Sequence, residues 1–140
     1  MSRVIKLETA GKERNQLIRA TALAVRQLLQ QKEVNQATRD LAAFCALTLA
    51  AIAETIDPSV AAWEKRGYWV KADRFRMDWL WAGQLAQALR QAILADDWQK
   101  VAQTAVQVAQ RLADVKVPQR HRLGTPWTGA YELLKQGEQS

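Results

Sequence analysis

The chain has few of the residue types that cross-link a fold, bind metals or interrupt helices. Its 140 residues include one cysteine, one histidine, three prolines and six glycines. Because Cys45 is alone, no intramolecular disulfide and no cysteine-based zinc site can form, and we expect a reducing, cytoplasmic setting. Because His121 is alone, a histidine-rich metal centre is excluded. We therefore expect neither a metal ion nor another cofactor.

Catalytic motifs are missing as well. The sequence has no H-E-x-x-H, P-loop, G-x-G-x-x-G or G-x-S-x-G pattern, and no Glu-x-x-His pair of the kind that holds a di-iron centre in a bundle. Asp96 and Asp97 are adjacent carboxylates, but they precede a predicted helix, where a capping role is expected. No nucleophile is placed with a base and an orienting group. The pattern favours a non-enzymatic protein.

Long apolar runs are also lacking. The longest, Leu41–Ala53, has thirteen residues, whereas a membrane-spanning helix needs about 20. Residues 1–6 contain no apolar core of a signal peptide. We therefore interpret Leu41–Ala53 as a buried helix and expect no association with a membrane.

Helix-forming residues fill most of the chain. Its content of 49% hydrophobic and 24% charged residues is that of an ordinary globular protein, and the scarcity of glycine and proline favours helix almost throughout. Apolar periodicity predicts four main helices and a short fifth one. We expect them at about residues 9–31, 35–54, 58–95, 96–115 and 126–136, with a short N-terminal segment at 1–8 and a loop at 116–125.

Capping signals support these boundaries. Asn35, Asp57 and Asp96 are each placed to cap the helix that follows. Whether Gly67 interrupts the third helix is left open. Since the sequence has neither an internal repeat nor a glycine-rich β-turn pattern, we predict one all-α domain over residues 1–140. Its architecture is a bundle of about four main helices plus a short C-terminal helix.

The segment YWVKADRFRMDWLW, residues 68–81, concentrates aromatic and charged side chains. On a continuous helix with about 100° per residue, the apolar residues around it form two opposed stripes. One stripe consists of Trp63, Val70, Met77, Trp81 and Ala88, and the other of Tyr68, Phe75, Trp79 and Ile93. A helix with two opposed apolar faces is covered on both sides, by its own bundle or by another molecule. The sequence leaves open which stripe is core.

The predicted function is contact with another protein, either a partner or a second copy of the chain. Tryptophan, tyrosine and arginine are enriched among the residues that dominate binding at protein interfaces. The residues that we expect at this interface are Tyr68, Phe75, Trp79 and Arg76. Asp73 and Arg76, three residues apart, have the spacing of a helix-surface ion pair. Arg74 and Asp78, four residues apart, have such a spacing as well.

Positive charge supports a second hypothesis, which is nucleic-acid binding. The net charge is +6 at pH 7 and the isoelectric point is near 9.8, and such a chain attracts phosphate. The expected phosphate contacts are Lys12, Arg19 and Arg26, which recur every seven residues, together with Arg120 and Arg122 of the segment QRHR. No recognisable RNA- or DNA-binding module accompanies them. A small-molecule pocket among the tryptophans is left open too.

Overall fold

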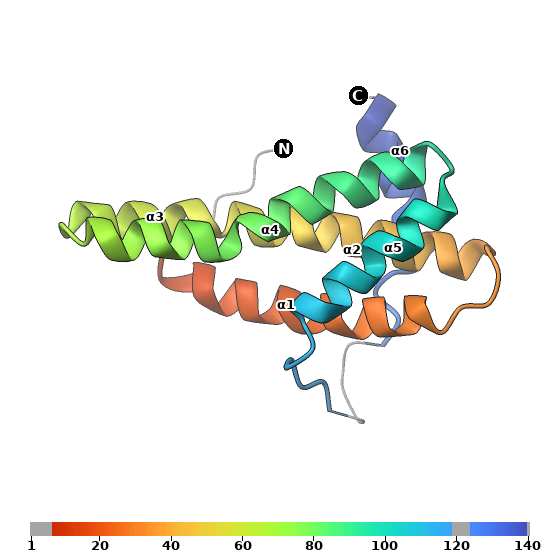
Figure 1. Ribbon diagram of the computed structural model, residues 1–140, viewed down its shortest axis with the longest axis horizontal. Helices are drawn as coiled ribbons and strands as arrows, with labels where there is room; N and C mark the ends of the chain where they lie inside the picture. Colours follow the sequence, from red (N-terminus) through yellow and green to blue (C-terminus); the bar gives the residue numbers. More distant parts are fainter. Residues whose placement is uncertain (1–6, 119–123, 140) are drawn as a thin grey trace.

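Helices account for all the regular secondary structure in the part of the chain that the structure describes. The computed structural model describes residues 7–118 and 124–139. The helices are α1 (Leu7–Leu29), α2 (Gln36–Glu54), α3 (Ile56–Lys65), α4 (Trp69–Leu94), α5 (Trp98–Arg111) and α6 (Ala130–Gln139). They pack into one bundle (Figure 1). The predicted all-α bundle is therefore confirmed.

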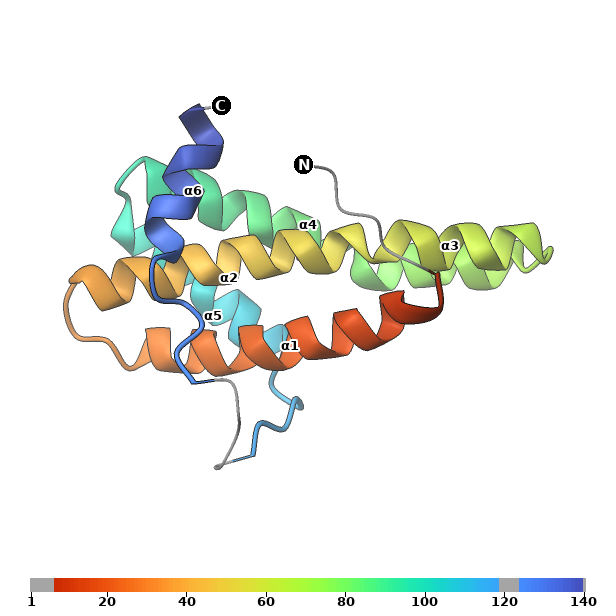
Figure 2. The ribbon, with the colours of Figure 1, turned by 180° about the vertical axis from the view of Figure 1, so that it is seen from behind.

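The long helix α2 lies at the centre of the bundle. It packs against α1, α4 and α6. Figure 1 shows α4 and α5 on one side of it, and Figure 2 shows α6 crossing its other side. Leu41, Leu49 and Ile52 of α2 are all at most 2% exposed. The predicted buried helix is thus the core of the fold.

Small side chains bring α2 and α4 close together. Ala43 and Ala46 of α2 and Ala82 of α4 are buried. Next to them, a methyl group added at Gly83 would lie 3.6 Å from Cβ of Ala53, which is ordinary van der Waals contact. At this point only a methyl group and a glycine separate the two helices, which allows α2 and α4 to approach closely.

The third predicted helix is in fact two helices. α3 follows α2 after the single residue Thr55, and the chain then reverses at Gly67, which has a φ of +84°. Glycine adopts this left-handed conformation without the steric cost that a Cβ would bring. Asp57 lies in the first turn of α3 and does not cap it, because α3 begins one residue earlier. The structure therefore places the break that the sequence left open at Gly67.

The other helix ends differ from the predicted ones by a few residues. The cap at Asn35 is confirmed, since its side chain accepts a hydrogen bond from the N–H of Thr38. For α5, however, the cap is Asp97, which accepts from the N–H of Lys100 at 3.1 Å. The predicted cap, Asp96, instead accepts a hydrogen bond from Nε1 of Trp98.

Four further boundaries were predicted incorrectly. α1 begins at Leu7 and ends at Leu29, and α5 ends at Arg111. α6 begins at Ala130 because residues 126–129 form a turn, in which Gly129 has a φ of +84°. These are differences of two to four residues, the usual range over which helix ends fray or tighten.

One continuous helical stretch resembles a membrane-spanning segment in length and composition. Residues Gln36–Lys65, which comprise α2 and α3, have a mean hydropathy of 1.5 in their most apolar window. Of that window, 56% is buried inside the fold. The central position of α2 in the bundle accounts for its apolar composition, and the structure is consistent with a soluble protein.

The single cysteine is sealed in this core. Cys45 is fully buried, and burial raises the pKa of its thiol from 9.0 to about 12, because the thiolate is poorly solvated there. The folded state thus keeps a proton that the unfolded chain loses near pH 9. The contribution of this protonated thiol to the free energy of unfolding is complete below about pH 9 and is lost as the pH rises towards 12.

We expect this effect to be measurable by comparing wild type with Cys45→Ala. The difference between their free energies of unfolding should shrink by about 2 kcal/mol between about pH 8 and about pH 10.5, because one pKa unit corresponds to about 1.4 kcal/mol. Denaturant titrations at the two pH values measure it. A difference that does not change with pH would contradict the assignment, as would rapid modification of the folded thiol by a disulfide reagent at pH 8.

Candidate interaction surface

Two antiparallel helices project from the bundle. α3 and the N-terminal half of α4 extend beyond the end of α1 (Figures 1 and 2), and we call residues 56–80 the arm. Ile56, Val60 and Ala72 are buried between its two helices. The arm is therefore a packed helical hairpin with a small core of its own.

An aromatic cluster continues this core towards the bundle. The rings of Trp63 and Phe75 meet edge to face, with centroids 4.8 Å apart. Phe75 lies 6.4 Å from Trp79, and Trp79 stacks on Trp81 at 5.8 Å. Contacts of this kind contribute about 0.5–1.5 kcal/mol each beyond the area that they bury. The cluster joins the two helices of the arm to the part of α4 that lies in the bundle.

Arg14 of α1 attaches the arm to the bundle. Its side chain is only 9% exposed, and its guanidinium carbon lies 4.9 Å from the ring centre of Phe75 and 5.8 Å from that of Trp79. Nε donates to Oγ1 of Thr55 at 2.9 Å, and Nη2 donates to the carbonyl of Thr55 at 3.0 Å and to Oγ of Ser59 at 2.8 Å. Burial lowers the pKa of Arg14 from its ordinary value. No carboxylate of the described residues forms an ion pair with it, so the carbonyl end of α2 and the rings supply its negative environment.

Sequence analysis did not single out Arg14, although a signal was present. Counting from Arg14, the apolar residues Leu17, Ile18 and Val25 follow at positions i+3, i+4 and i+11. These spacings place the arginine on the apolar face of α1. A cation in that row must find partners inside the fold, whereas Lys12 and Arg19 are exposed.

The structure separates the residues that were predicted to form the partner interface. Tyr68 and Arg76 are exposed, while Phe75 and Trp79 are half-buried in the aromatic cluster. Of the two predicted stripes, the one that contains Phe75, Trp79 and Ile93 faces the fold. The other stripe is divided, since Val70 and Met77 are exposed whereas Trp63 and Trp81 are half-buried in the aromatic cluster.

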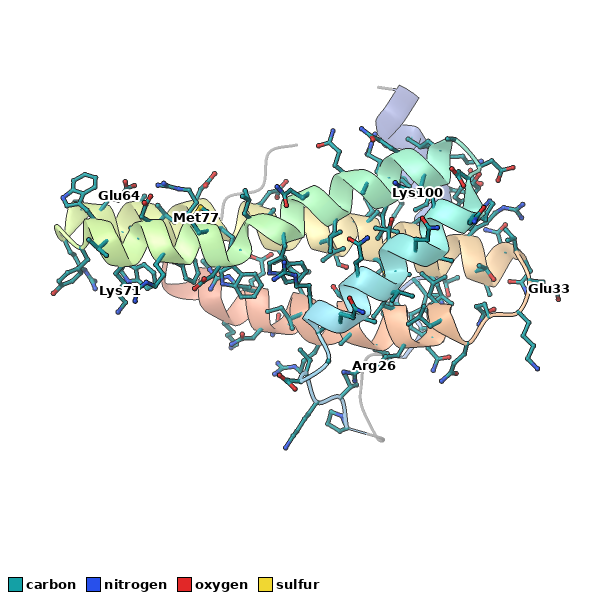
Figure 3. All side chains as sticks on the ribbon, viewed as in Figure 1. Arg26, Glu33, Glu64, Lys71, Met77 and Lys100 are labelled. Carbon is teal, nitrogen blue, oxygen red and sulfur yellow. The ribbon has the colours of Figure 1, made fainter. Side chains whose placement is uncertain are left out.

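The exposed side of α4 within the arm forms what we call the outer face of the arm. Val70 is 75% exposed, Met77 66% and Leu80 50%. Figure 3 shows Met77 and Lys71 on opposite edges of the arm. The outer face consists of Val70, Asp73, Arg74, Met77 and Leu80.

The outer face is apolar only within the arm. Further along α4, the same side of the helix carries the exposed residues Gln84, Gln87 and Gln91. A face that serves only for contact with water would be polar over its whole length. This change from apolar to polar side chains therefore distinguishes the surface of the arm from the rest of α4.

Two shallow grooves flank a ridge near the tip of the arm. The larger has a volume of about 790 Å³ and is lined in part by Trp63, Phe75 and Lys71. The smaller has a volume of about 550 Å³ and is lined in part by Met77 and Asp73. The residues that line both grooves are Trp69, Val70 and Arg74. Apolar side chains with charged neighbours thus surround the ridge.

The charges of the arm are only partly paired. The predicted pair between Asp73 and Arg76 is present, with Oδ1 and Nη1 2.9 Å apart, and Arg76 also lies 3.6 Å from the carboxylate of Glu64 on α3. The predicted pair between Arg74 and Asp78 is not formed, and Arg74 has no ion pair with any described residue. Its guanidinium is therefore available to a ligand.

The residues predicted to contact nucleic acid do not form one patch within the described part of the chain. Lys12 and Arg19 are exposed on α1. Arg26 is half-buried, and its Nη2 donates to the carbonyls of Leu112 at 3.1 Å and Val115 at 2.6 Å, beyond the end of α5. It thus satisfies carbonyls at a helix C-terminus, where positive charge is favourable. The remaining two, Arg120 and Arg122, lie outside the described residues.

The fold and this surface define an all-α bundle with a projecting two-helix arm. Comparisons of the chain with protein-family models, with curated proteins and with solved structures find no match. Within residues 7–118 and 124–139, no group of three or more His, Cys, Asp or Glu side chains is placed to hold a metal ion. The function of this chain must therefore be inferred from its own residues.

Proposed function

We propose that this chain is a non-enzymatic protein that acts by binding protein through the outer face of its arm. The observation that carries the proposal is the exposure of Val70, Met77 and Leu80 on a helix whose corresponding side is polar elsewhere. Clustered apolar side chains on a surface are typical of interaction sites. The exposed rings of Tyr68 and Trp69 at the same end belong to the residue types that dominate interface binding.

The construction of the arm also favours binding. Its two helices are locked by the aromatic cluster and by the hydrogen bonds of Arg14 to Thr55 and Ser59. A surface that is held rigid before binding loses less conformational entropy when a partner docks. The setting that we propose is the cytoplasm, because a chain with one cysteine forms no intramolecular disulfide, the bond that is typical of proteins in oxidising compartments.

Protein is a better match to the outer face than nucleic acid. Asp73 lies in the middle of this face, and Asp78 lies beside it. Phosphate groups would be repelled by both, whereas a protein surface can pair with charges of either sign. The exposed cations of α1, Lys12 and Arg19, belong to a different helix from the outer face.

Site-specific photo-crosslinking in the cells that produce the chain tests this function. A benzoylphenylalanine at position 70 should give covalent protein adducts, and the same group at position 91, on the polar part of the same helix side, should not. Adding Met77→Glu should remove the adducts of position 70, since a buried carboxylate at the contact is costly. Equal adducts from both positions, or none from either, would refute the proposal. Adducts that disappear after nuclease treatment would favour nucleic acid instead.

A further inference from the structure

We infer that the occupant of the outer face is a second copy of this chain, with the two α4 helices antiparallel and Asp73 of each copy beside Arg74 of the other. This inference rests on the proposed function and specifies its partner. It follows from the order of residue types along the outer face, from the unpaired charge of Arg74, and from the way the arm projects.

The outer face has the symmetry that a two-fold contact needs. In such a contact, if residue i touches residue j of the other copy, then j also touches i. Val70 and Met77 lie at equal distances in sequence from the point between Asp73 and Arg74. An antiparallel pair centred on that point therefore places Val70 of one copy opposite Met77 of the other, twice. It also places Asp73 opposite Arg74, twice.

The charges specify this alignment. Arg74 has no ion pair within the described chain, and Asp73 binds Arg76 through Oδ1. Shifting the antiparallel pair by one residue would bring Asp73 against Asp73 or Arg74 against Arg74. A parallel pair in register would also place each of these residues against its own copy. Like charges placed together at an interface oppose binding, so the alignment that pairs Asp73 with Arg74 is the favourable one.

The shape of the molecule leaves room for the contact. Because the arm extends beyond α1 (Figures 1 and 2), two arms can overlap while the bundles stay at opposite ends. Leu80 then approaches the turn at Gly67 of the other copy, and a methyl group at Gly67 would have no neighbour within 4 Å. With few apolar side chains from each copy, the contact belongs to the small interfaces of about 1,200 Å² or less. We expect a reversible dimer with a micromolar dissociation constant.

Charge reversal with purified full-length protein tests the alignment. Asp73→Arg leaves two cations at the centre of each arm, and Arg74→Asp leaves two anions. Each variant alone should dimerise at least about tenfold more weakly than wild type. Mixed in equal amounts, the two should form a heterodimer, since both central contacts are then between opposite charges. The control is Asp114→Arg, which makes the same charge change as Asp73→Arg at an exposed position outside the arm. This variant should dimerise like wild type.

Sedimentation equilibrium from about 1 μM to about 1 mM, with circular dichroism to verify helical content, gives the readout. A wild-type monomer over the whole range would overturn the inference. So would a dimer that both single variants retain, or a mixture of the two that stays monomeric. Adducts of position 70 with a different protein, together with a wild-type monomer, would preserve the proposed function and remove only the second copy. Absence of any adduct at position 70 would remove both.

Discussion

Arg14→Ala is expected to lower the free energy of unfolding by about 3 kcal/mol and the melting temperature by about 10 °C. The substitution leaves the hydroxyl and the carbonyl of Thr55 without their donors, at distances that are now 2.9 and 3.0 Å. It also removes the guanidinium that lies over the rings of Phe75 and Trp79. Hydrogen bonds from charged groups contribute about 1.5–3 kcal/mol, and a buried acceptor left unpaired costs about 1–3 kcal/mol.

The loss should be concentrated in the arm. Amide hydrogen exchange in α3 and in the first half of α4 should accelerate more than in α2, because Arg14 ties that region to α1. Arg14→Lys should recover only part of the stability, since an ammonium lacks the planar fork that reaches both Thr55 and Ser59. Arg19→Ala, on the exposed side of the same helix, is the matched control and should change stability by at most about 0.5 kcal/mol. Equal effects of Arg14→Ala and Arg19→Ala would contradict the role of Arg14.

Asp40→Ala should detach α6 from the bundle and lower the free energy of unfolding by about 2–3 kcal/mol. Asp40 is a buried residue of α2, 6% exposed. Its Oδ2 accepts from the N–H of Gly129 at 3.2 Å, and its Oδ1 accepts from the N–H of Tyr131 at 3.1 Å. These donors lie at the start of α6, where N–H groups have no partner within the helix. The carboxylate of Asp40, although it belongs to another helix, thus caps the N-terminus of α6.

Hydrogen exchange and chemical denaturation measure this prediction. Amides of α6 should lose protection in Asp40→Ala, and Leu134, now 1% exposed, should become accessible. Asp40→Asn should be intermediate, since it keeps an acceptor but loses the charge that suits a helix N-terminus. Asp97→Ala removes an exposed N-cap from α5 and should cost only about 1 kcal/mol. Wild-type exchange rates for α6 in Asp40→Ala would show that packing alone holds this helix.

Local sequence patterns predicted the helices well. Asn35 caps α2 as expected, and the apolar row of α5 is buried at Val101, Ala105 and Val108. Periodicity and capping depend on residues within a few positions of one another, so they can be seen without knowing the fold. The errors at the ends of α1, α5 and α6 have the same origin, because turn geometry and tertiary contacts set the last residues of a helix.

The position of the proposed interaction surface was only half predictable. The spacing of Phe75, Trp79, Val70 and Met77 showed two opposed stripes on the helix but could not show which one is covered. The answer depends on the reversal at Gly67, which folds α3 back along α4 so that Phe75 and Trp79 lie inside. Val70 and Met77 are left outside because, among the described residues, no other helix reaches the end of the arm (Figure 1).

The sequence by itself thus determined an all-α bundle with a buried second helix and an aromatic segment of unusual pattern. Only the tertiary structure decided which charges are structural. Arg14 binds Ser59, 45 positions away, and Asp40 binds the N–H of Tyr131, 91 positions away. Helix propensity and apolar periodicity are local properties, which depend on residues within a few turns of one another. Burial of a charge is decided by residues that are distant in the chain, so its cause becomes visible only when the helices have packed.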